Sequence, residues 1–388
     1  KEDIAYHLTH FLDNGYLASD QIMNWPAEGN SGFSKYLAPF IDFNLDGLYT
    51  PKDGDYPAIK GDKAVYCIFN DINDEHTASF GAGLGIEVQM LAYTYSESDA
   101  IYLEYFIINR RPRIYSDVKI GFFLDGECGL RTDNYAGTLE QYPQTIFVHN
   151  GDDTDEDFFM NDLPFVGVVF LNENLAQSIS FTDGNGKNGK PQVNTDFIRY
   201  SLGMWRDSTP LTYGKSGTET GDKTPYIFAQ SSLNNDEIWT ETSEMNNLGA
   251  RTILGITDEP ILSPRGYIKR NFAIISGTTT STESFTAEIK QKASSASQFW
   301  KATNNTRLVY QPEVHNIYPN PTNGSFTITN LTKNSEILII DSQGVTVFSK
   351  RYFESSNYTC NVSIAIGVYQ ILIRTNNRIS HQPLLIAN

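Results

Sequence analysis

Cysteine is scarce in this chain: its 388 residues include only Cys67, Cys128 and Cys360. At most one pair can form a disulfide, so the chain is not a small scaffold held together by disulfides. Cys67 and Cys128 both fall in or beside predicted strands, where they are either one bridge or two buried thiols. We expect free thiols.

Long apolar runs are also missing, and no stretch reaches the length that a membrane-spanning helix requires. Two common hydrolase motifs, Gly-x-Ser-x-Gly and His-Glu-x-x-His, do not occur. The glycine-rich stretch 183–189 lacks the Gly-Lys-Ser/Thr ending of a phosphate-binding loop and is expected to be a surface loop. His7 and His10 could share a helix face, but no third metal ligand accompanies them. Nucleophilic catalysis therefore finds little support.

Basic residues are few: 29 Lys and Arg stand against 46 Asp and Glu, for a net charge of −17. From Glu313 onward, four acidic and five basic residues give +1, so the part before it carries −17 − 1 = −18. An acidic surface repels phosphate backbones, which argues against nucleic acid as a partner. It favours divalent cations, although acidity also simply keeps an extracellular protein soluble.

Strand-forming and turn-forming residues are plentiful, with 22 Tyr, 23 Phe and 29 Gly. Alternating or β-rich segments predict strands at 64–70, 86–95, 101–109, 118–125, 145–149, 166–171, 197–204, 226–230, 251–256, 267–276 and 284–291. Helical spacing is confined to 4–13, 34–37 and 293–303. No repeat of propeller length is present. The pattern predicts a mainly β body over residues 1–303, a β-sandwich of the jelly-roll or Greek-key kind, followed by a linker at 304–315.

One stretch of the body has the spacing of a calcium loop. Side-chain oxygens fall at positions one, three, five and twelve, with Gly47 at position six, and the residue at position seven would contribute its carbonyl. The predicted ligands are Asp42, Asn44, Asp46, Leu48 and Asp53. Position twelve is Asp rather than the Glu of EF-hands, and Pro51 and Pro57 prevent a following helix. The loop thus resembles those of dockerin or thrombospondin-type repeats and predicts a structural calcium ion. The alternative is an ordinary Asp/Asn/Gly turn.

Other acidic groups could bind or catalyse. Asp125, Glu127 and Asp133 follow a predicted strand among glycines, and we expect either a second cation site or a plain polar turn. Paired carboxylates could also serve a glycosidase, and the candidates are Asp71, Asp74, Glu75, Glu87, Asp125, Glu127 and Asp133. His76 could act as a general base, although a loop histidine bonded to a neighbouring carboxylate is commoner. Trp25, Trp205 and Trp239 are either sugar-stacking loop residues or, as we favour, residues at the edge of the core.

The last part of the chain, residues 316–388, reads as a separate small module. It opens with Tyr318-Pro319-Asn320-Pro321-Thr322-Asn323-Gly324 and continues through short alternating segments at 325–328, 337–341, 345–348, 358–362, 368–374 and 384–386. Prolines restrict the entry, and Ser342-Gln343-Gly344 separates two segments at hairpin distance. The pattern predicts a small Ig-like antiparallel β-sandwich.

These residues also resemble a known family. Three motifs, Tyr-Pro-Asn-Pro-Thr-x-Gly, Ile-Ile-Asp-Ser-x-Gly and Gly-Val-Tyr-Gln-Ile, look like the C-terminal sorting domain of type IX secretion cargo from Bacteroidetes. The residues that carry the resemblance are Tyr318, Pro319, Asn320, Pro321, Gly324, Gly344, Gly367 and Tyr369. It implies export through the periplasm to the cell surface or beyond, with the outer-membrane translocon and its shuttle proteins as partners. It also implies that an export signal has already been removed from the sequence given, and that the linker is a cleavage region.

The body resembles a group of Bacteroidetes surface proteins without a known activity. The resemblance rests on Asp62, Asn70, Asp71, His76, Gly85, Glu87 and Gln89, on 123–137 and on 203–207. It implies one continuous unit from about Asp42 to Lys301. We expect a non-enzymatic surface role, adhesion or binding of a glycan or protein ligand; gliding or secretion machinery is one setting for such a role. A glycan-active hydrolase is the alternative.

Overall fold

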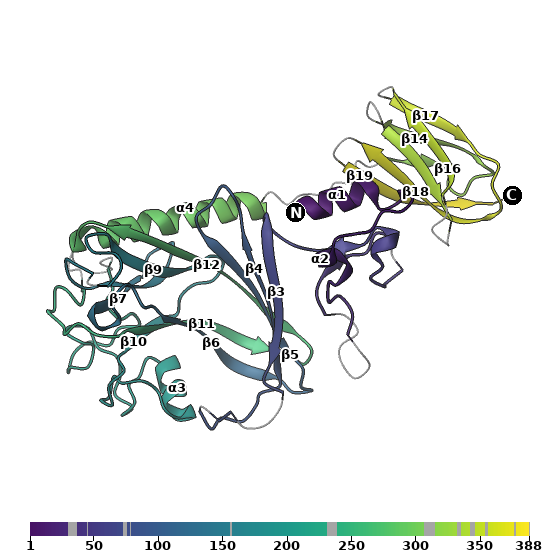
Figure 1. The fold of residues 1–388 in the computed structure, drawn as a ribbon. Helices are drawn as coiled ribbons and strands as arrows, with labels where there is room; N and C mark the ends of the chain where they lie inside the picture. Colours follow the sequence, from purple (N-terminus) through teal and green to yellow (C-terminus); the bar gives the residue numbers. More distant parts are fainter. Residues whose placement is uncertain are drawn as a thin grey trace. The chain divides into compact units, whose positions relative to one another are not determined.

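The computed structural model describes residues 1–29, 37–44, 46–72, 76–77, 79–155, 157–230, 239–305, 315–331, 335–341, 346–353, 356–375 and 378–387. The chain forms two compact units (Figure 1). One is Ile59–Ala302, which we call the body. The other joins Lys1–Ala58, the N-terminal segment, to Thr303–Asn388, which contains the tail. The expected helix around 34–37 and most of the expected linker lie outside the described residues.

The body is built on two antiparallel sheets. Its elements are β3 (Lys63–Asn70), β4 (Ile86–Thr94), β5 (Ile101–Asn109), β6 (Tyr115–Asp125), β7 (Asn134–Leu139), β8 (Thr145–Asn150), β9 (Leu163–Phe170), β10 (Gln177–Phe181), α3 (Asn194–Ser201), β11 (Thr252–Leu262), β12 (Tyr267–Thr279) and α4 (Phe285–Asn305). The larger sheet has the order β3-β4-β5-β12-β9-β8-β7, and the smaller one β10-β11-β6. The mainly β sandwich predicted from the sequence is confirmed.

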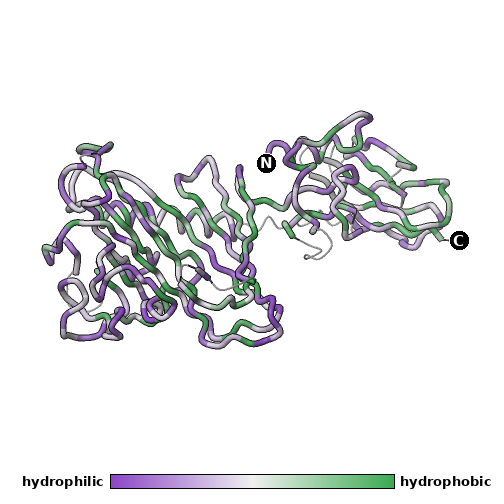
Figure 2. The backbone as a smooth tube through the Cα atoms, turned by 60° about the horizontal axis from the view of Figure 1, so that its bottom comes forward, coloured by the Kyte–Doolittle hydropathy of each residue, from purple (hydrophilic) through white to green (hydrophobic). Residues whose placement is uncertain are grey.

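Apolar residues cover both faces of the larger sheet. On one face, Val148, Phe170 and Phe272 share a buried cluster with Ile253 of the smaller sheet. On the other face, Phe285 and Ile289 of α4 pack in a second buried cluster, since residues three or four apart lie on one side of a helix. Figure 2 shows the resulting pattern, with apolar stretches along the strands and polar ones at many connections.

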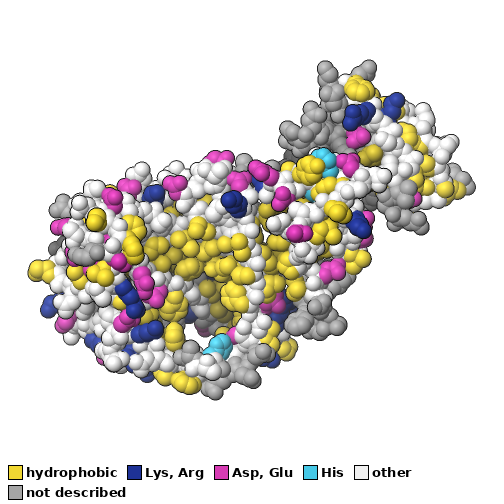
Figure 3. All heavy atoms as spheres, in the orientation of Figure 1, with side chains coloured by type: hydrophobic (Ala, Val, Ile, Leu, Met, Phe, Trp, Pro, Cys, Tyr) yellow, Lys and Arg dark blue, Asp and Glu magenta, His cyan; other side chains and the backbone are white. Residues whose placement is uncertain are grey.

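The sandwich is bridged on one side and open on the other. The predicted strand 226–230 makes only two isolated bridges, from Tyr226 to β10 and from Ala229 to β7, so it links the edges of the two sheets. At the opposite edge, β3 presents Val65 and Phe69 to solvent, 66% and 50% exposed. Figure 3 shows apolar side chains gathered on this face of the body, between α4 and β6.

Residues 226–230 are thus not a regular strand, and two more predicted strands of the body are helical instead. Residues 197–204 lie largely in α3, where Phe197 packs edge-on against Phe123 and Tyr200 stacks on Phe181, three residues further along the same helix. Of residues 284–291, all but Ser284 belong to α4, which places Phe285 and Ile289 on its buried face. Short apolar segments do not distinguish a strand from a helix by periodicity alone. The helix predicted at 293–303 is the second half of α4.

The second unit contains the small sandwich of the tail. Its strands are β13 (Ile317–Tyr318), β14 (Ser325–Leu331), β15 (Ser335–Ile340), β16 (Thr346–Tyr352), β17 (Ser356–Asn361), β18 (Gly367–Thr375) and β19 (Arg378–Ile386). They form the sheets β13-β14-β17 and β16-β15-β18-β19, which enclose a core around Phe326, Ile339 and Ile371. The predicted antiparallel tail is confirmed, although the turn at 342–344 lies outside the described residues.

The N-terminal segment contains α1 (Glu2–His10), α2 (Asp20–Met23), β1 (Phe40–Ile41) and β2 (Tyr56–Pro57). The sequence placed these residues in the body, and residues 42–58 in one continuous unit with it. The structure instead groups them with the tail, because Phe11 and Phe43 share a buried cluster with residues of β15 and β18.

Candidate functional site

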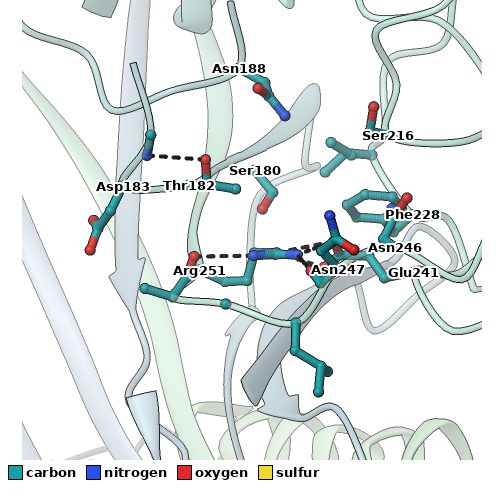
Figure 4. A pocket seen from close by; sticks show the side chains of 15 residues that line it. Ser180, Thr182, Asp183, Asn188, Ser216, Phe228, Glu241, Asn246, Asn247 and Arg251 are labelled. Atoms are coloured by element: carbon teal, nitrogen blue, oxygen red, sulfur yellow. Dashed lines mark hydrogen bonds and ion pairs between the residues drawn. The ribbon is translucent and has the colours of Figure 1, made fainter. Parts of the chain in front are cut away.

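A polar pocket of about 530 Å³ lies beside β10 and β11 (Figure 4). It is lined mainly by hydroxyl, amide and charged side chains together with a few apolar ones. The residues are Ser180, Thr182, Asp183, Gly184, Asn188, Ser216, Ile227, Phe228, Glu241, Asn246, Asn247, Leu248, Gly249, Ala250 and Arg251. Such a lining can donate and accept many hydrogen bonds while offering a small apolar surface.

A buried ion pair, Glu241 with Arg251, stands in this pocket. The Arg251 Nη2 lies 2.9 Å from Glu241 Oε1, and its Nε lies 3.0 Å from both carboxylate oxygens. The Ala136 amide donates to Glu241 Oε2 at 2.7 Å. Burial raises the pKa of Glu241, and the Arg251 guanidinium and these hydrogen bonds oppose that rise. The two side chains are 3% and 6% exposed, so each neutralises a charge that would be costly alone.

The glycine-rich loop 183–189 forms part of the pocket rim. Asp183 accepts a hydrogen bond from Arg131 Nη2 at 2.6 Å, which pairs this second carboxylate as well. Thr182 forms a bridge with Gly189, and a Cβ at Gly189 would lie 1.8 Å from the Gly184 carbonyl oxygen. Only glycine fits there, so this loop has a defined path rather than being a mere connection.

Asp71 and Glu87, two of the carboxylates that the sequence proposed for catalysis, have structural partners. Asp71 accepts hydrogen bonds from the amides of Leu84 and Ile86, and its Oδ2 lies 3.9 Å from His76 Nε2. Glu87 accepts two hydrogen bonds from Arg110, at 2.6 and 3.0 Å. Burial raises the pKa of Glu87, but the hydrogen bonds from Arg110 and Gln89 outweigh it, so the net shift is downward. Asp74 and Glu75 lie outside the described residues.

The three residues of the expected second cation site have different partners. Asp125 accepts a hydrogen bond from Thr252 Oγ1 at 2.9 Å, and Glu127 lies 3.1 Å from Arg131 Nε. Asp133 is 4% exposed and accepts a hydrogen bond from the Asn150 side chain. Over the described ranges, no three His, Cys, Asp or Glu side chains form a group that could hold a metal ion. The second cation site stays a prediction.

Two of the three candidate tryptophans are core residues, whereas Trp25 is partly exposed and donates to the Pro39 carbonyl at 3.0 Å. Trp205 and Trp239 are 0% and 1% exposed and donate to the carbonyls of Gly217 and Lys215. They are therefore unavailable for stacking on a sugar. All three cysteines are free thiols, as expected. Burial raises the pKa of Cys128 to about 12 and that of Cys360 to about 11.

The loop predicted to bind calcium is held by its own side chains. Asp42 Oδ2 accepts a hydrogen bond from the Gly47 amide at 2.8 Å, and Asp46 Oδ1 accepts one from the Leu48 amide at 2.8 Å. The Asn44 side chain contacts Asp46 through both its oxygen and its nitrogen. Gly47 has φ +77°, which a residue with a Cβ rarely adopts. The other oxygen of Asp42 is buried and, among the described residues, accepts no hydrogen bond.

Acidic neighbours surround this loop. The Asp55 carboxylate accepts hydrogen bonds from the amides of Phe43 and Thr50, both at 2.7 Å. Burial, together with Asp42 and Asp46, raises the pKa of Asp55 to about 6, against the effect of these two bonds. Burial and the nearby Asp46 likewise raise the pKa of Asp53. The loop thus concentrates negative charge.

The motif at the start of the tail joins its first residues to its last strand. The Asn320 side chain donates to the Pro383 carbonyl at 2.7 Å and accepts from the Leu385 amide at 2.9 Å. Thr322 exchanges backbone hydrogen bonds with Leu385 and Ala387. Gly324 has φ +106°, and a Cβ there would lie 2.5 Å from the Val362 carbonyl oxygen. Tyr318 remains 51% exposed.

The motif at the start of β18 is also structural. Tyr369 is 8% exposed and donates from its hydroxyl to the Ala365 carbonyl at 2.8 Å. Gly367 begins β18 and pairs with Ile386 of β19. Gly344 lies outside the described residues. Asn320, Gly324 and Tyr369 of these motifs thus make contacts that stabilise the sandwich.

Residues 316–387 match the family described as the secretion system C-terminal sorting domain. With this sorting domain the chain is a cargo of type IX secretion, exported to the cell surface or the extracellular space. Over the described residues, no helix is both long and apolar enough to span a membrane.

Other comparisons add little. No curated protein matches the chain. A polysaccharide lyase structure is 10% identical, with a TM-score of 0.25 over 77% of this chain and 34% of that one. PorZ, a surface component of the type IX secretion system of Porphyromonas gingivalis, is 9% identical, with a TM-score of 0.19 over 86% of this chain and 45% of that one. The chain spans less than half of either protein, and similarities this weak do not indicate an activity.

Sequence reasoning missed the pocket residues. Glu241 lies outside every predicted element and Arg251 opens the strand predicted at 251–256, and no motif links them to each other, to Ser180 or to the loop 183–189. The only available signal was the glycine-rich loop itself, which was interpreted as a connection.

Proposed function

We propose that this exported protein binds a polar, hydroxyl-rich ligand, such as a surface glycan, in the pocket beside β10 and β11. The observation that supports this is the combination of a concave, hydrogen-bonding surface with paired carboxylates. Glu241 and Asp183 each lie against an arginine, which satisfies the charge that a hydrolase would need to leave available. A binding role needs only the polar lining.

The test is a glycan-array measurement with the full chain. Asn188→Leu and Asn247→Leu remove polar groups that line the pocket. We expect each to weaken binding about ten-fold, since losing one or two net hydrogen bonds costs about 1–2 kcal/mol. Asn161→Leu, at an exposed body residue, is the matched control. Equal binding by the wild type and both pocket variants would rule the site out.

A glycan-active hydrolase is the second candidate, because two carboxylates line one pocket. It predicts that the wild type releases product from a bound glycan. Glu241→Gln or Asp183→Asn would then abolish release while the protein stays folded, as judged by thermal melting. If the wild type binds glycan but releases no product, and both variants bind the same glycans, the non-enzymatic role is favoured.

We further propose that calcium stabilises the loop 42–53. The ligands would be the side chains of Asp42, Asn44, Asp46 and Asp53 with the Leu48 carbonyl, since oxygen donors of this kind suit calcium. The three aspartates do not form a metal-holding group in the structure, so the bound ion would have to draw their carboxylates together. What supports the fit is the buried oxygen of Asp42, which has no donor among the described residues, while the other oxygen fixes the turn at Gly47. Bound cation would offset the charge that these carboxylates concentrate.

Thermal melting with and without chelator tests the calcium proposal. We expect chelation to lower the Tm of the wild type by several degrees, because a ligand that binds only the folded state stabilises it. Asp46→Ala should melt at the same temperature in either condition. Asp13→Ala, at an exposed aspartate of the same segment, should respond like the wild type. If chelator leaves the wild-type Tm unchanged, the loop is an ordinary turn.

A further inference from the structure

The larger sheet of the sorting domain is apolar on both faces. Successive residues of a strand point to opposite faces, so Ile337 and Ile339 enter the sandwich core while Leu338 and Ile340 point away from it. Leu372 of β18, which pairs with Leu338, lies on the same outer face. This outer face is nevertheless covered, because Leu338, Ile340 and Leu372 are only 6%, 8% and 1% exposed.

The N-terminal segment supplies the cover. Phe11 and Phe43 share one buried cluster with these three residues, and Leu12 and Tyr16 pack against it. The two phenylalanine rings meet edge to face, with centroids 5.2 Å apart. Gly54 lies against both rings: a Cβ there would be 2.9 Å from Phe43 and 3.0 Å from Phe11. The contact is therefore closely packed on the side of the N-terminal segment.

Polar contacts within the segment hold the two rings in place. Buried His7 of α1 makes a 3.1 Å hydrogen bond to the Asp55 carbonyl and a 3.2 Å one to the Tyr16 hydroxyl. The Asp55 carboxylate accepts hydrogen bonds from the backbone amides of Phe43 and Thr50. These bonds join α1, which ends just before Phe11, to the loop that bears Phe43, so the segment presents both rings together.

We propose that residues 1–58 are an intramolecular partner of the sorting domain and hold it without a covalent bond. The segment continues into the body at Ile59, whereas the sorting domain follows the body through residues 303–315. Residues 1–58 and the sorting domain, which are separated in sequence by the body, thus belong to one compact unit. A chain cut between residues 306 and 314 keeps its sorting domain until this apolar contact opens.

The experiment uses the full chain with residues 307–312 replaced by the recognition sequence of a site-specific protease. After complete cleavage, the fragment that contains residues 316–388 should co-elute with the rest of the protein in size-exclusion chromatography. The double variant Phe11→Ala, Phe43→Ala should release it, with affinity lower by on the order of a hundred-fold or more, given the cost of deleting buried rings. Leu17→Ala, which removes a side chain 80% exposed in the same segment, should retain it.

A second measurement separates release from misfolding. In the uncut chain, amide exchange in β15 and β18 should speed up in the double variant, while protection in the body strands stays unchanged. Separation of the fragments without any substitution would overturn the proposal. So would retention by the double variant, because the fragment would then be held elsewhere.

Discussion

His149 should make the body sensitive to mild acid. Its ring lies in β8, 4.4 Å from the ring of Phe285 in α4 and 5.9 Å from that of Phe147. Burial lowers its pKa from 6.5 to about 4, and a hydrogen bond to the Asn150 carbonyl only partly opposes this. Below pH 6.5 the unfolded chain binds a proton at this residue that the folded chain does not accept.

This difference in proton binding sets how the free energy of unfolding changes with pH. Because the unfolded state holds more protons between pH 6.5 and about 4, the free energy of unfolding falls as the pH falls through this window. A difference of about 2.5 pKa units at about 1.36 kcal/mol each gives a loss of about 3 kcal/mol. Carboxylates titrate in the lower part of the same window, so a comparison between variants is needed.

Urea unfolding of the wild type and His149→Gln at several pH values between 7 and 4 isolates the effect. Glutamine cannot ionise. Between pH 7 and 4 the free energy of unfolding of the wild type should therefore fall by about 3 kcal/mol more than that of the variant. Contributions from His7 and the carboxylates are common to both proteins and cancel. His76→Gln, at a side chain 44% exposed in the same unit, is the control. Parallel curves for the wild type and His149→Gln would refute the reasoning.

Three further predictions concern the body and the tail. Arg251→Ala should destabilise the body by about 3–5 kcal/mol in chemical denaturation, because Glu241 is left buried and unpaired, and adding Glu241→Gln should recover part of the loss. Gly255→Ala should cost about 1–3 kcal/mol in the same assay, since its Cβ would lie 2.6 Å from Phe170 Cζ; a neutral effect would mean that the core relaxes. Deleting residues 316–388 should leave the protein in the periplasm on cell fractionation, and its appearance outside the cell would contradict the assigned export route.

Long alternating segments made most of the sheet predictable. The strands expected at 86–95 and 101–109 are found as β4 and β5 within one residue, because alternation over nine residues has no helical equivalent. The tail was also predictable, since prolines, glycines and short strands fixed its boundaries. The segments 197–204 and 284–291 were too short for periodicity to decide, and tertiary contacts made both of them helical.

The candidate pocket and the role of the N-terminal segment were not predictable. Burial of Glu241 against Arg251 depends on the path of the loop around them, which no local pattern encodes. The apolar residues of α1 signalled a helix, but not that Phe11 would cover the sorting domain. In β15 the residues Ile337–Ile340 are all apolar, so no alternation is visible in the sequence. Such a run is typical of a strand that is covered on both faces, but the sequence does not show which residues cover it.

The position of β12 also governs how the body folds. β12 pairs with β5 on one side and β9 on the other, so it alone connects the two three-stranded halves of the larger sheet. Ile101 of β5 pairs with Ile274 of β12, although more than one hundred and fifty residues separate them in the sequence. Such distant pairings form slowly. Until β12 pairs, β5 and β9 each have a long unpaired edge, the kind of edge on which two unfinished chains can pair with each other.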